Sequence, residues 1–203
     1  MRQKIGAIIG FTLVLGALGF PIYLGTKQQS NLRRFHAVRE GVLYRSAQLS
    51  VPGIQKAVHD FGIRTMVNLR DGATIQDQEE ERYCQMKGIR FVRINPLKWE
   101  GGQGKAPVDA GLKKFLEVMQ DPQNHPVLLH CFRGVHRTGG YVAVYRMEME
   151  NWPIDQAVRE MISLGYEQYE EHLDMKGYME GFRKSGKYHL GIPVMHQVKV
   201  EPR

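Results

Sequence analysis

A cysteine and an arginine separated by five residues are the side chains of this sequence best placed to do chemistry. They lie in a segment that follows the apolar run Val127–Leu129 and reads His130, Cys131, Phe132, Arg133, Gly134, Val135, His136, Arg137, Thr138 and Gly139. A five-residue loop around a thiol can turn successive backbone N–H groups inward, and a helix that follows adds unpaired amides and the positive end of its dipole. The spacing therefore predicts a socket for a tetrahedral dianion such as phosphate.

Each reactive side chain of this segment has a predicted role. The positive surroundings should lower the pKa of the Cys131 thiol, so that a thiolate attacks phosphorus. Arg137 can bind two phosphate oxygens at once through its planar guanidinium group, which a lysine cannot do. Thr138 can donate its hydroxyl to the sulfur and help it leave, so all three are predicted catalytic residues. The residues between them are predicted to bind the substrate, namely Phe132, Arg133, Gly134, Val135 and His136.

The same residue types have other uses in proteins. A cysteine after an apolar strand can be an inert thiol of the core. A zinc site is a second alternative, since four residues with ligand atoms stand close in sequence, namely His125, His130, Cys131 and His136. Structural zinc sites usually add a Cys-x-x-Cys pair, and the sequence has none. The combined spacing of cysteine, glycine and arginine favours phosphate chemistry, and we expect neither a metal nor another cofactor.

Alternating strands and helices are predicted to position this loop. The predicted strands are Val42–Tyr44, Ile63–Leu69, Ile89–Ile94 and Pro126–His130, and the predicted helices are Val51–Phe61, Asp77–Lys87, Ala110–Gln120, Thr138–Glu150 and Ile154–Leu164. The strands are short, apolar and rich in branched residues. This alternation predicts an α/β fold with a largely parallel central sheet flanked by helices on both faces. Ligands of such folds bind at the carboxyl ends of the strands, which is where the Cys131 loop would lie.

The composition agrees with one globular domain and indicates anionic partners. The 203 residues are 42% hydrophobic and 24% charged, which excludes a disordered or fibrous chain. Lysine and arginine number 28 against 21 aspartate and glutamate, and the net charge of +7 favours phosphorylated molecules, nucleic acid or an acidic lipid surface. Nucleic acid is not expected, because no basic stripe with interleaved aromatic residues is present. Two cysteines exclude a disulfide-rich scaffold.

The N-terminal part of the chain is predicted to span a membrane. Ile5–Thr26 is a run of 22 residues without a charge, and as a helix it would reach about 30 Å, the thickness of the hydrocarbon layer. A cleaved signal peptide and a buried core helix are the alternatives. Basic residues flank both ends of the run, so the side of the membrane stays open. The chain then divides into a membrane anchor (1–26), a linker (27–34), a catalytic domain (35–190) and a C-terminal tail (191–203).

The signature segment resembles that of the cysteine-dependent tyrosine and dual-specificity phosphatases. In that family a His-Cys pair is followed by five residues, an arginine and a serine or threonine, and the matching residues are His130, Cys131, Arg137 and Thr138. Further segments resemble the small dual-specificity-like phosphatases of bacteria, fungi and plants, namely Phe35–Val38, Gly41–Gln48, Gly62–Arg70, Tyr145–Arg146 and Ala157–Met161. The resemblance covers residues 31–185. It implies the phosphatase fold, a supporting role for His130, and a metal-free reaction through a phosphocysteine intermediate.

The general acid is where the sequence departs from that family's pattern. The chemistry needs a carboxylic acid to protonate the departing oxygen and then to activate water. The resemblance implies an aspartate in a loop well before the cysteine, but residues 96–104 contain none. Glu100 is the carboxylate in that window and lies in a glycine-rich stretch, so it is the predicted acid. Asp71 and Asp109 are the alternatives.

These features predict a membrane-anchored phosphomonoester hydrolase. The expected substrates are proteins phosphorylated on tyrosine, serine or threonine. Inositol polyphosphates or phosphoinositides are the alternative, because Arg133 and His136 add positive charge beside the loop and the related fungal and plant enzymes carry a similarly basic loop. A phosphate-binding tether without turnover is the alternative from another functional class. Cys84 could form a disulfide with Cys131 after oxidation, or it could fill the core.

Overall fold

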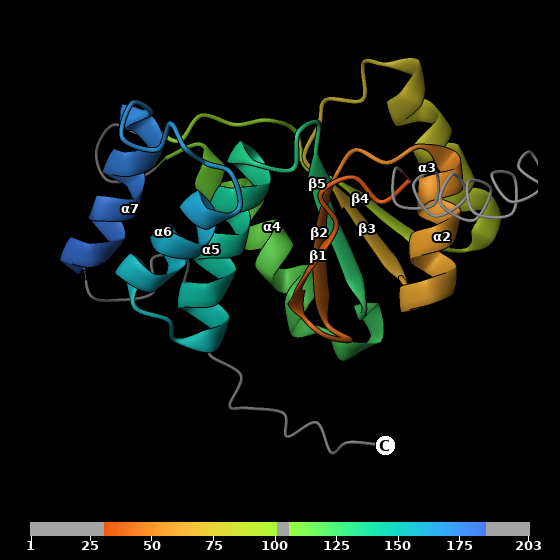
Figure 1. Ribbon diagram of the computed structural model, residues 1–203, viewed down its shortest axis with the longest axis horizontal. Helices are drawn as coiled ribbons and strands as arrows, with labels where there is room; N and C mark the ends of the chain where they lie inside the picture. Colours follow the sequence, from red (N-terminus) through yellow and green to blue (C-terminus); the bar gives the residue numbers. More distant parts are fainter. Residues whose placement is uncertain (1–30, 101–105, 186–203) are drawn as a thin grey trace, which may run out of the picture.

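The computed structural model describes residues 31–100 and 106–185, and in these residues a five-stranded sheet carries helices on both faces (Figure 1). The strands are β1 (His36–Arg39), β2 (Leu43–Ala47), β3 (Thr65–Asn68), β4 (Arg90–Arg93) and β5 (Val127–Cys131). The helices are α2 (Val51–Phe61), α3 (Ile75–Lys87), α4 (Val108–Gln120), α5 (His136–Glu150), α6 (Ile154–Ser163) and α7 (Leu173–Ser185), with a short 3₁₀ helix at Pro122–Asn124.

The strand order places β5 at the centre of the sheet. The order is β1-β2-β5-β3-β4, and all neighbours pair in parallel except β1, which runs antiparallel to β2 at one edge. In this register Ala47 of β2 stands beside Cys131, and Asn68 of β3 stands beside His130. Parallel strands end at the same edge of a sheet, so the residues that follow β2, β3 and β5 meet there.

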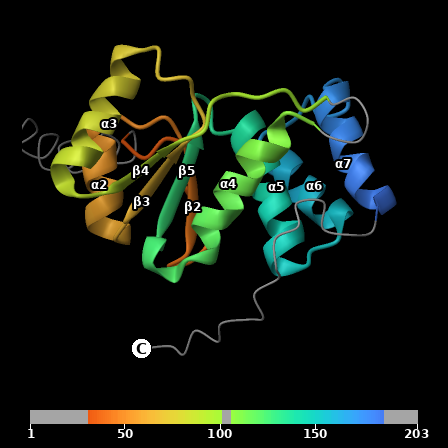
Figure 2. The same ribbon diagram turned by 180° about the vertical axis from the view of Figure 1, so that it is seen from behind.

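Two apolar layers hold the helices on the sheet. Helices α2 and α3 cover one face, whereas α4 and α5 cover the other, with α6 and α7 farther out (Figures 1 and 2). Along β5, Leu128 belongs to the cluster beneath α2 and α3, while Val127, Leu129 and Cys131 belong to the opposite cluster. Because side chains alternate along a strand, the intervening His130 faces α3. Neighbouring residues of β5 therefore serve different layers.

Local signals at the helix ends explain several of these boundaries. Gly62 and Gly88 end α2 and α3 in the left-handed conformation, with φ of 65° and 67°, which costs glycine little. Helix α3 begins at a capping box, in which the Thr74 side chain accepts from the Asp77 N–H and the Asp77 side chain accepts from the Thr74 N–H. These caps fix the two helices that lie on the His130 face of the sheet.

The α/β fold with a largely parallel sheet is confirmed, with corrections at the level of elements. The predicted helix Val51–Phe61 agrees with α2 at both ends, but the predicted helix Thr138–Glu150 begins two residues earlier, at His136. Strand β1 and helix α7 have no counterpart among the predicted elements. One residue of β1 is buried, Val38, so the strand has too little apolar pattern to be seen in the sequence.

The predicted membrane-spanning run, Ile5–Thr26, lies outside the described residues, as does the predicted tail 191–203. Within residues 31–100 and 106–185, none of the helices has both the length and the apolar character that crossing a bilayer requires.

Candidate active site

The segment predicted to bind phosphate lies at the carboxyl edge of the central strand. Strand β5 ends at Cys131 and α5 begins at His136, so residues 132–135 form a short loop between a strand end and a helix start. This is the arrangement in which backbone N–H groups and the positive end of a helix dipole face the same anion. The sequence prediction placed a strand before this loop and a helix after it, although the strand ends one residue later and the helix begins two residues earlier than predicted.

The loop is fixed by its neighbours on β2. Gly134 has φ of 68°, and a Cβ there would lie 2.5 Å from the backbone N of Ala47, so that any other residue would have to displace the strand. The Gly134 N–H donates to the Cys131 Sγ over 3.2 Å. Its carbonyl oxygen accepts from the Arg45 Nη2 at 2.7 Å, and the Gln48 N–H donates to the Phe132 carbonyl oxygen at 3.2 Å.

The surroundings of Cys131 favour the thiolate. Burial raises the pKa of this 5% exposed thiol, but hydrogen bonds from the Thr138 hydroxyl and N–H, the Gly134 N–H and the charge of His130 outweigh that effect. The pKa therefore lies below its ordinary value of 9.0. This agrees with the sequence expectation that the loop and the helix start would activate the sulfur.

A buried ion pair lies behind the nucleophile. The His130 Nε2 is 2.6 Å from the Glu80 Oε1 of α3, and both side chains are 2% exposed. The Asn68 Nδ2 donates to the other Glu80 oxygen at 2.9 Å. Burial alone would lower the pKa of His130, but the charge and hydrogen bond of Glu80 raise it. Glu80 thereby keeps the imidazole charged. His130 and Cys131 are neighbours in the chain, but their side chains lie on opposite faces of the sheet.

Replacing Glu80 with alanine should destabilise the fold by about 3 kcal/mol, because it leaves the buried imidazole without its partner. The pKa of His130 is raised on folding, so the pair stabilises the protein fully below the unfolded pKa of about 6.5, and this stabilisation is lost as pH rises through the folded pKa. Urea unfolding near pH 6 and near pH 9 measures both effects. Glu79→Ala, on an exposed neighbour, is the control, and equal losses in the two variants would contradict the assignment.

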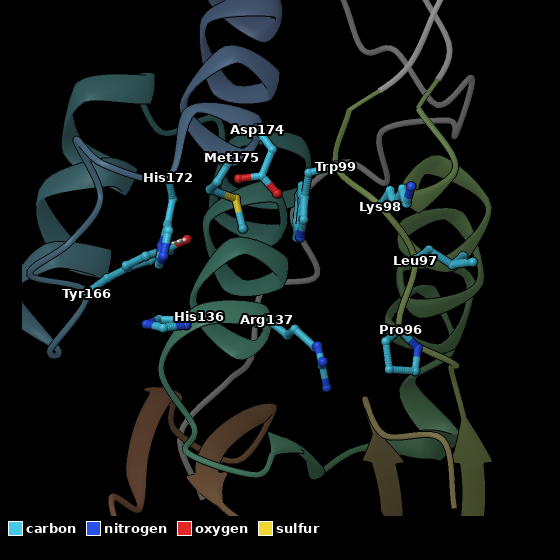
Figure 3. Close-up of a pocket in the computed structure, with 10 residues that line it drawn as sticks. All are labelled: Pro96, Leu97, Lys98, Trp99, His136, Arg137, Tyr166, His172, Asp174 and Met175. Carbon is cyan, nitrogen blue, oxygen red and sulfur yellow. Dashed lines mark hydrogen bonds between the residues drawn. The ribbon is translucent and has the colours of Figure 1, made fainter.

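Arg137 extends into a cavity in front of the loop. The cavity has a volume of about 380 Å³ and includes residues from α5, α7 and the segment before α4. In Figure 3, His136, Tyr166 and His172 form one side, Pro96, Leu97 and Lys98 form the other, and the Arg137 guanidinium group points between them. Its Nη1 donates to the Leu69 carbonyl oxygen at 3.3 Å, and the rest of this exposed group is available for a ligand.

One wall of the cavity is a stack of rings. His136 stacks on Tyr166 with ring centroids 4.6 Å apart, and the Tyr166 hydroxyl lies 2.9 Å from the His172 Nδ1 (Figure 3). Burial, followed by the charges of His172, Arg133 and Arg137, lowers the pKa of His136. His136 is therefore neutral at neutral pH, and the expectation that it adds positive charge at the rim needs this correction. Arg133 and Arg137 supply the charge instead.

A second cluster positions Phe132 at the rim. Arg70, which follows β3, lies over the Phe132 ring at 5.1 Å and forms an ion pair with the buried Asp77 at 2.8 Å. Gln48 joins the cluster, since it donates to Asp77 and accepts from Arg70. Residues that follow β2 and β3 thus brace the loop that follows β5.

The structure separates the three candidates for the general acid. Asp109 is occupied, because its carboxylate accepts from the Tyr178 hydroxyl at 2.7 Å and from the Ala106 N–H at 3.0 Å. Asp71 accepts from the Ala73 N–H in an exposed turn. Glu100 is exposed and directly follows Trp99, which lines the Arg137 cavity. Asp174 at the start of α7 lines the same cavity and was not among the predicted candidates.

The two cysteines lie in different layers. Cys84 is packed in the cluster beneath α2 and α3, and burial raises its pKa to about 12, whereas Cys131 belongs to the cluster on the other face. Both are free thiols. This placement supports the reading of Cys84 as a core residue and gives no support to its pairing with Cys131.

Sequence reasoning missed the residues that support the loop from a distance. Arg45 is buried in β2, where burial lowers its pKa to about 10 and still leaves it charged at neutral pH. An arginine inside a short apolar strand was the available signal. Glu80 stands in a run of three glutamates on a charged helix, which in sequence has the pattern of a solvated face.

A comparison with protein families decides the class of this chain. Residues 31–192 match the tyrosine phosphatase family. The chain belongs to this family. The phosphatase match covers the strand, loop and helix around Cys131 as well as the segment from Asn31 that leads into β1.

The relatives of this chain differ in their named activities. The inositol diphosphatase DSP5 of Arabidopsis thaliana is 44% identical over 110 residues, covering 51% of this chain and 52% of that protein. The dual specificity protein phosphatase TpbA of Pseudomonas aeruginosa is 32% identical over 107 residues, covering 46% of this chain and 48% of TpbA. The chain thus spans about half the length of the curated relatives that it matches.

The fold has a close counterpart among solved structures. The core catalytic domain of the PP-IP phosphatase SIW14 from S. cerevisiae superposes with a TM-score of 0.59 at 24% identity. The superposition covers 73% of this chain and 85% of that domain. At this level of identity the likeness establishes the fold.

Proposed function

We propose that this chain is a phosphomonoester hydrolase that acts through a phosphocysteine intermediate, and that the apolar run Ile5–Thr26 anchors it to a membrane. The observation that carries the proposal is the Cys131 sulfur at the end of β5, which accepts a hydrogen bond from the Gly134 N–H and faces the start of α5. An ionised sulfur next to inward-facing amides can hold and attack a phosphoryl group. Membership of the tyrosine phosphatase family supports this chemistry.

The reaction has two steps in this proposal. In the first, the Cys131 thiolate forms a bond to phosphorus while the bond from phosphorus to the ester oxygen breaks, and the departing oxygen takes a proton from a carboxylic acid. Arg137 binds two oxygens of the transferred group. In the second, water attacks phosphorus and gives its proton to the carboxylate, the bond from sulfur to phosphorus breaks, and Thr138 donates to the sulfur as it leaves. The products are the alcohol and inorganic phosphate.

Turnover of para-nitrophenyl phosphate by the full chain in detergent tests the proposal. The expected result is release of para-nitrophenolate together with an acid-quenched covalent phosphoenzyme whose mass increase maps to the peptide that contains Cys131. Binding of phosphate without any turnover would favour the tether. A covalent phosphate on a residue other than Cys131 would overturn the proposed mechanism.

Glu100 is the proposed general acid, because its exposed side chain directly follows Trp99, which lines the Arg137 cavity. Glu100→Gln is expected to lower kcat for an alkyl phosphate by about a hundredfold, and to affect para-nitrophenyl phosphate far less, since a good leaving group needs little protonation. The matched variant is Asp174→Asn, which changes the other carboxylate of the cavity. If Asp174→Asn shows the leaving-group dependence and Glu100→Gln does not, the role belongs to α7.

Two substrate classes follow from the relatives and from the cavity. Phosphorylated proteins are the first candidate, in line with the named activity of TpbA. Inositol phosphates are the second, in line with DSP5 and favoured by the exposed guanidinium groups of Arg133 and Arg137 beside the loop. A panel of phosphotyrosine, phosphoserine, phosphoinositide and inositol polyphosphate substrates compares them by kcat/KM.

A further inference from the structure

A second cavity, with a volume of about 470 Å³, opens beside the loop of residues 132–135. We call this loop, which connects β5 to α5, the phosphate loop. The lining of the second cavity includes Arg33, Arg34, Arg133, His136, Gly165 and Glu167. His136 lines both this cavity and the one that holds Arg137, so the two adjoin at its ring. A ligand whose phosphate lies in the Cys131 loop could therefore place another group in the second cavity.

The arginines of the second cavity lack acidic partners, unlike other arginines of the fold. Arg146 pairs with Glu150 and Glu160, Arg70 pairs with Asp77, and Arg93 pairs with Glu81, as the ion pairs of this domain show. Within residues 31–100 and 106–185, no carboxylate lies within salt-bridge distance of the three guanidinium groups of the second cavity, which are those of Arg33, Arg34 and Arg133.

The cavity also holds one carboxylate, that of the exposed Glu167. Three guanidinium groups against one carboxylate leave the lining positive even with His136 neutral. Like charges gathered around a hollow repel one another, and an anion in the hollow relieves that repulsion. The composition of the lining therefore favours an anionic ligand.

The segment that carries Arg33 and Arg34 is held in place. The Arg33 carbonyl oxygen accepts from the Ala47 N–H at 3.0 Å, at the end of β2. The Phe35 ring, two residues on, packs against the rings of Tyr44 and Phe61. Both side chains therefore extend from a fixed backbone beside the phosphate loop.

Arg34 itself has an unusual backbone. Its φ is 49°, in the left-handed region that few residues other than glycine adopt. Such a conformation persists only where the surroundings enforce it, and it is common at ligand sites. Glycine would adopt this conformation more easily. The position instead carries an arginine, whose side chain lines the cavity.

Gly165, in the turn after α6, makes room for the Arg34 side chain. Its φ is 104°, and a Cβ at this position would lie 2.8 Å from the Arg34 Nη1 and 3.7 Å from the Val135 Cγ2. The guanidinium group thus lies between the phosphate loop and the α6–α7 turn. The turn, the loop and the segment before β1 meet at one place in the fold.

We propose that Arg33, Arg34 and Arg133 form a second anion subsite, which binds a further phosphate group of the substrate while Cys131 attacks the first. The substrate class is then a compact molecule with at least two phosphate groups, either free in solution or displayed as a lipid headgroup. A compact scaffold fits because the two cavities adjoin at a single imidazole ring. This inference rests on the proposed phosphatase activity and names the substrate class for that same site.

The specificity ratio of the full chain in detergent tests the subsite. The ratio is kcat/KM for inositol trisphosphate divided by kcat/KM for para-nitrophenyl phosphate. In Arg33→Gln/Arg34→Gln it should fall at least tenfold, since each lost contact between a guanidinium group and a phosphate is worth about tenfold. The matched control is Arg64→Gln/Arg82→Gln, which removes the same charge from exposed positions outside both cavities and should leave the ratio within twofold.

Two further substrates identify the source of the second phosphate. One is phosphatidylinositol bisphosphate in phosphatidylcholine vesicles, and the other is a doubly phosphorylated peptide. A tenfold fall for the soluble inositol phosphate indicates a free ligand, and a fall confined to the vesicles indicates a lipid headgroup. A fall confined to the peptide overturns the proposal in favour of a protein substrate.

The proposed function and the subsite fail in different ways. No hydrolysis of para-nitrophenyl phosphate by the wild-type chain defeats the proposed function. Hydrolysis by the wild type, with a ratio that falls less than tenfold in the double variant for every substrate, defeats the subsite alone. If the double variant loses all hydrolysis, Arg34→Gln replaces it, and a fall in the ratio smaller than threefold then defeats the subsite.

Discussion

Replacing Cys131 with serine should abolish turnover, with kcat falling by about three orders of magnitude or more, while the loop still binds phosphate. The surroundings that favour a thiolate, namely the Gly134 N–H, the Thr138 hydroxyl and the charge of His130, cannot ionise a serine hydroxyl near neutral pH. The measurements are kcat/KM for para-nitrophenyl phosphate and calorimetric binding of inorganic phosphate. Residual activity within tenfold of the wild type would refute the role of the nucleophile.

The other cysteine supplies the control for this variant. Cys84 is fully buried in a different layer and its pKa is raised to about 12, so Cys84→Ala should keep kcat within about twofold of the wild type. The two thiols should also differ in alkylation by iodoacetamide, because the thiolate is the reactive form. The pKa of Cys131 is lowered, so part of this thiol is ionised at pH values below the ordinary thiol pKa of 9.0. Its alkylation should therefore already be fast below pH 9.0, and it should be lost as the pH falls through the lowered pKa.

Replacing Arg137 with lysine should lower kcat/KM by about a hundredfold to a thousandfold although the charge is kept. An ammonium group cannot bind two phosphate oxygens in one plane, and it would also lose the position that the Leu69 carbonyl oxygen gives to the guanidinium group. Steady-state kinetics on para-nitrophenyl phosphate measure the effect. The expected loss lies mainly in kcat, because the contact is strongest with the transferring group.

Arg82→Lys, an exposed substitution on α3, is the control for the arginine exchange. It should leave kcat/KM within about twofold of the wild type. A near-normal kcat/KM for Arg137→Lys would remove Arg137 from the phosphate site. In that case Arg133, the other exposed arginine of the loop region, would be the next position to test.

The sequence allowed prediction of those parts of the site that are adjacent along the chain. Cys131, Arg137 and the strand before them lie within a dozen residues, so their spacing alone predicts their geometry. The C-terminal end of helix α2 could be predicted because Gly62 ends it through a local conformational preference. Strand β1 was missed because a single buried residue gives no alternation.

Parts of the site that depend on tertiary contacts could not be predicted in this way. The acidic run that contains Glu80 has the composition of a solvated face, and only the 2.6 Å contact with His130 distinguishes Glu80 from its neighbours. The two arginines before β1 looked like a linker, yet the Ala47 N–H holds that segment against β2. The general acid was hard to predict because the three carboxylates considered, Asp71, Glu100 and Asp109, lie on different segments, and only the fold decides how near each one comes to the Cys131 loop.

The ion pair between His130 and Glu80 ties the reactivity of the sulfur to the integrity of a helix on the far side of the sheet. Helix α3 contributes no residue to the two cavities beside the loop, but it supplies the carboxylate that raises the pKa of the imidazole. If a change in α3 removes this carboxylate, the pKa of His130 falls, and the Cys131 thiolate loses one of the several interactions that lower its own pKa. A substitution on the opposite side of the sheet can therefore change the fraction of thiolate without touching the loop.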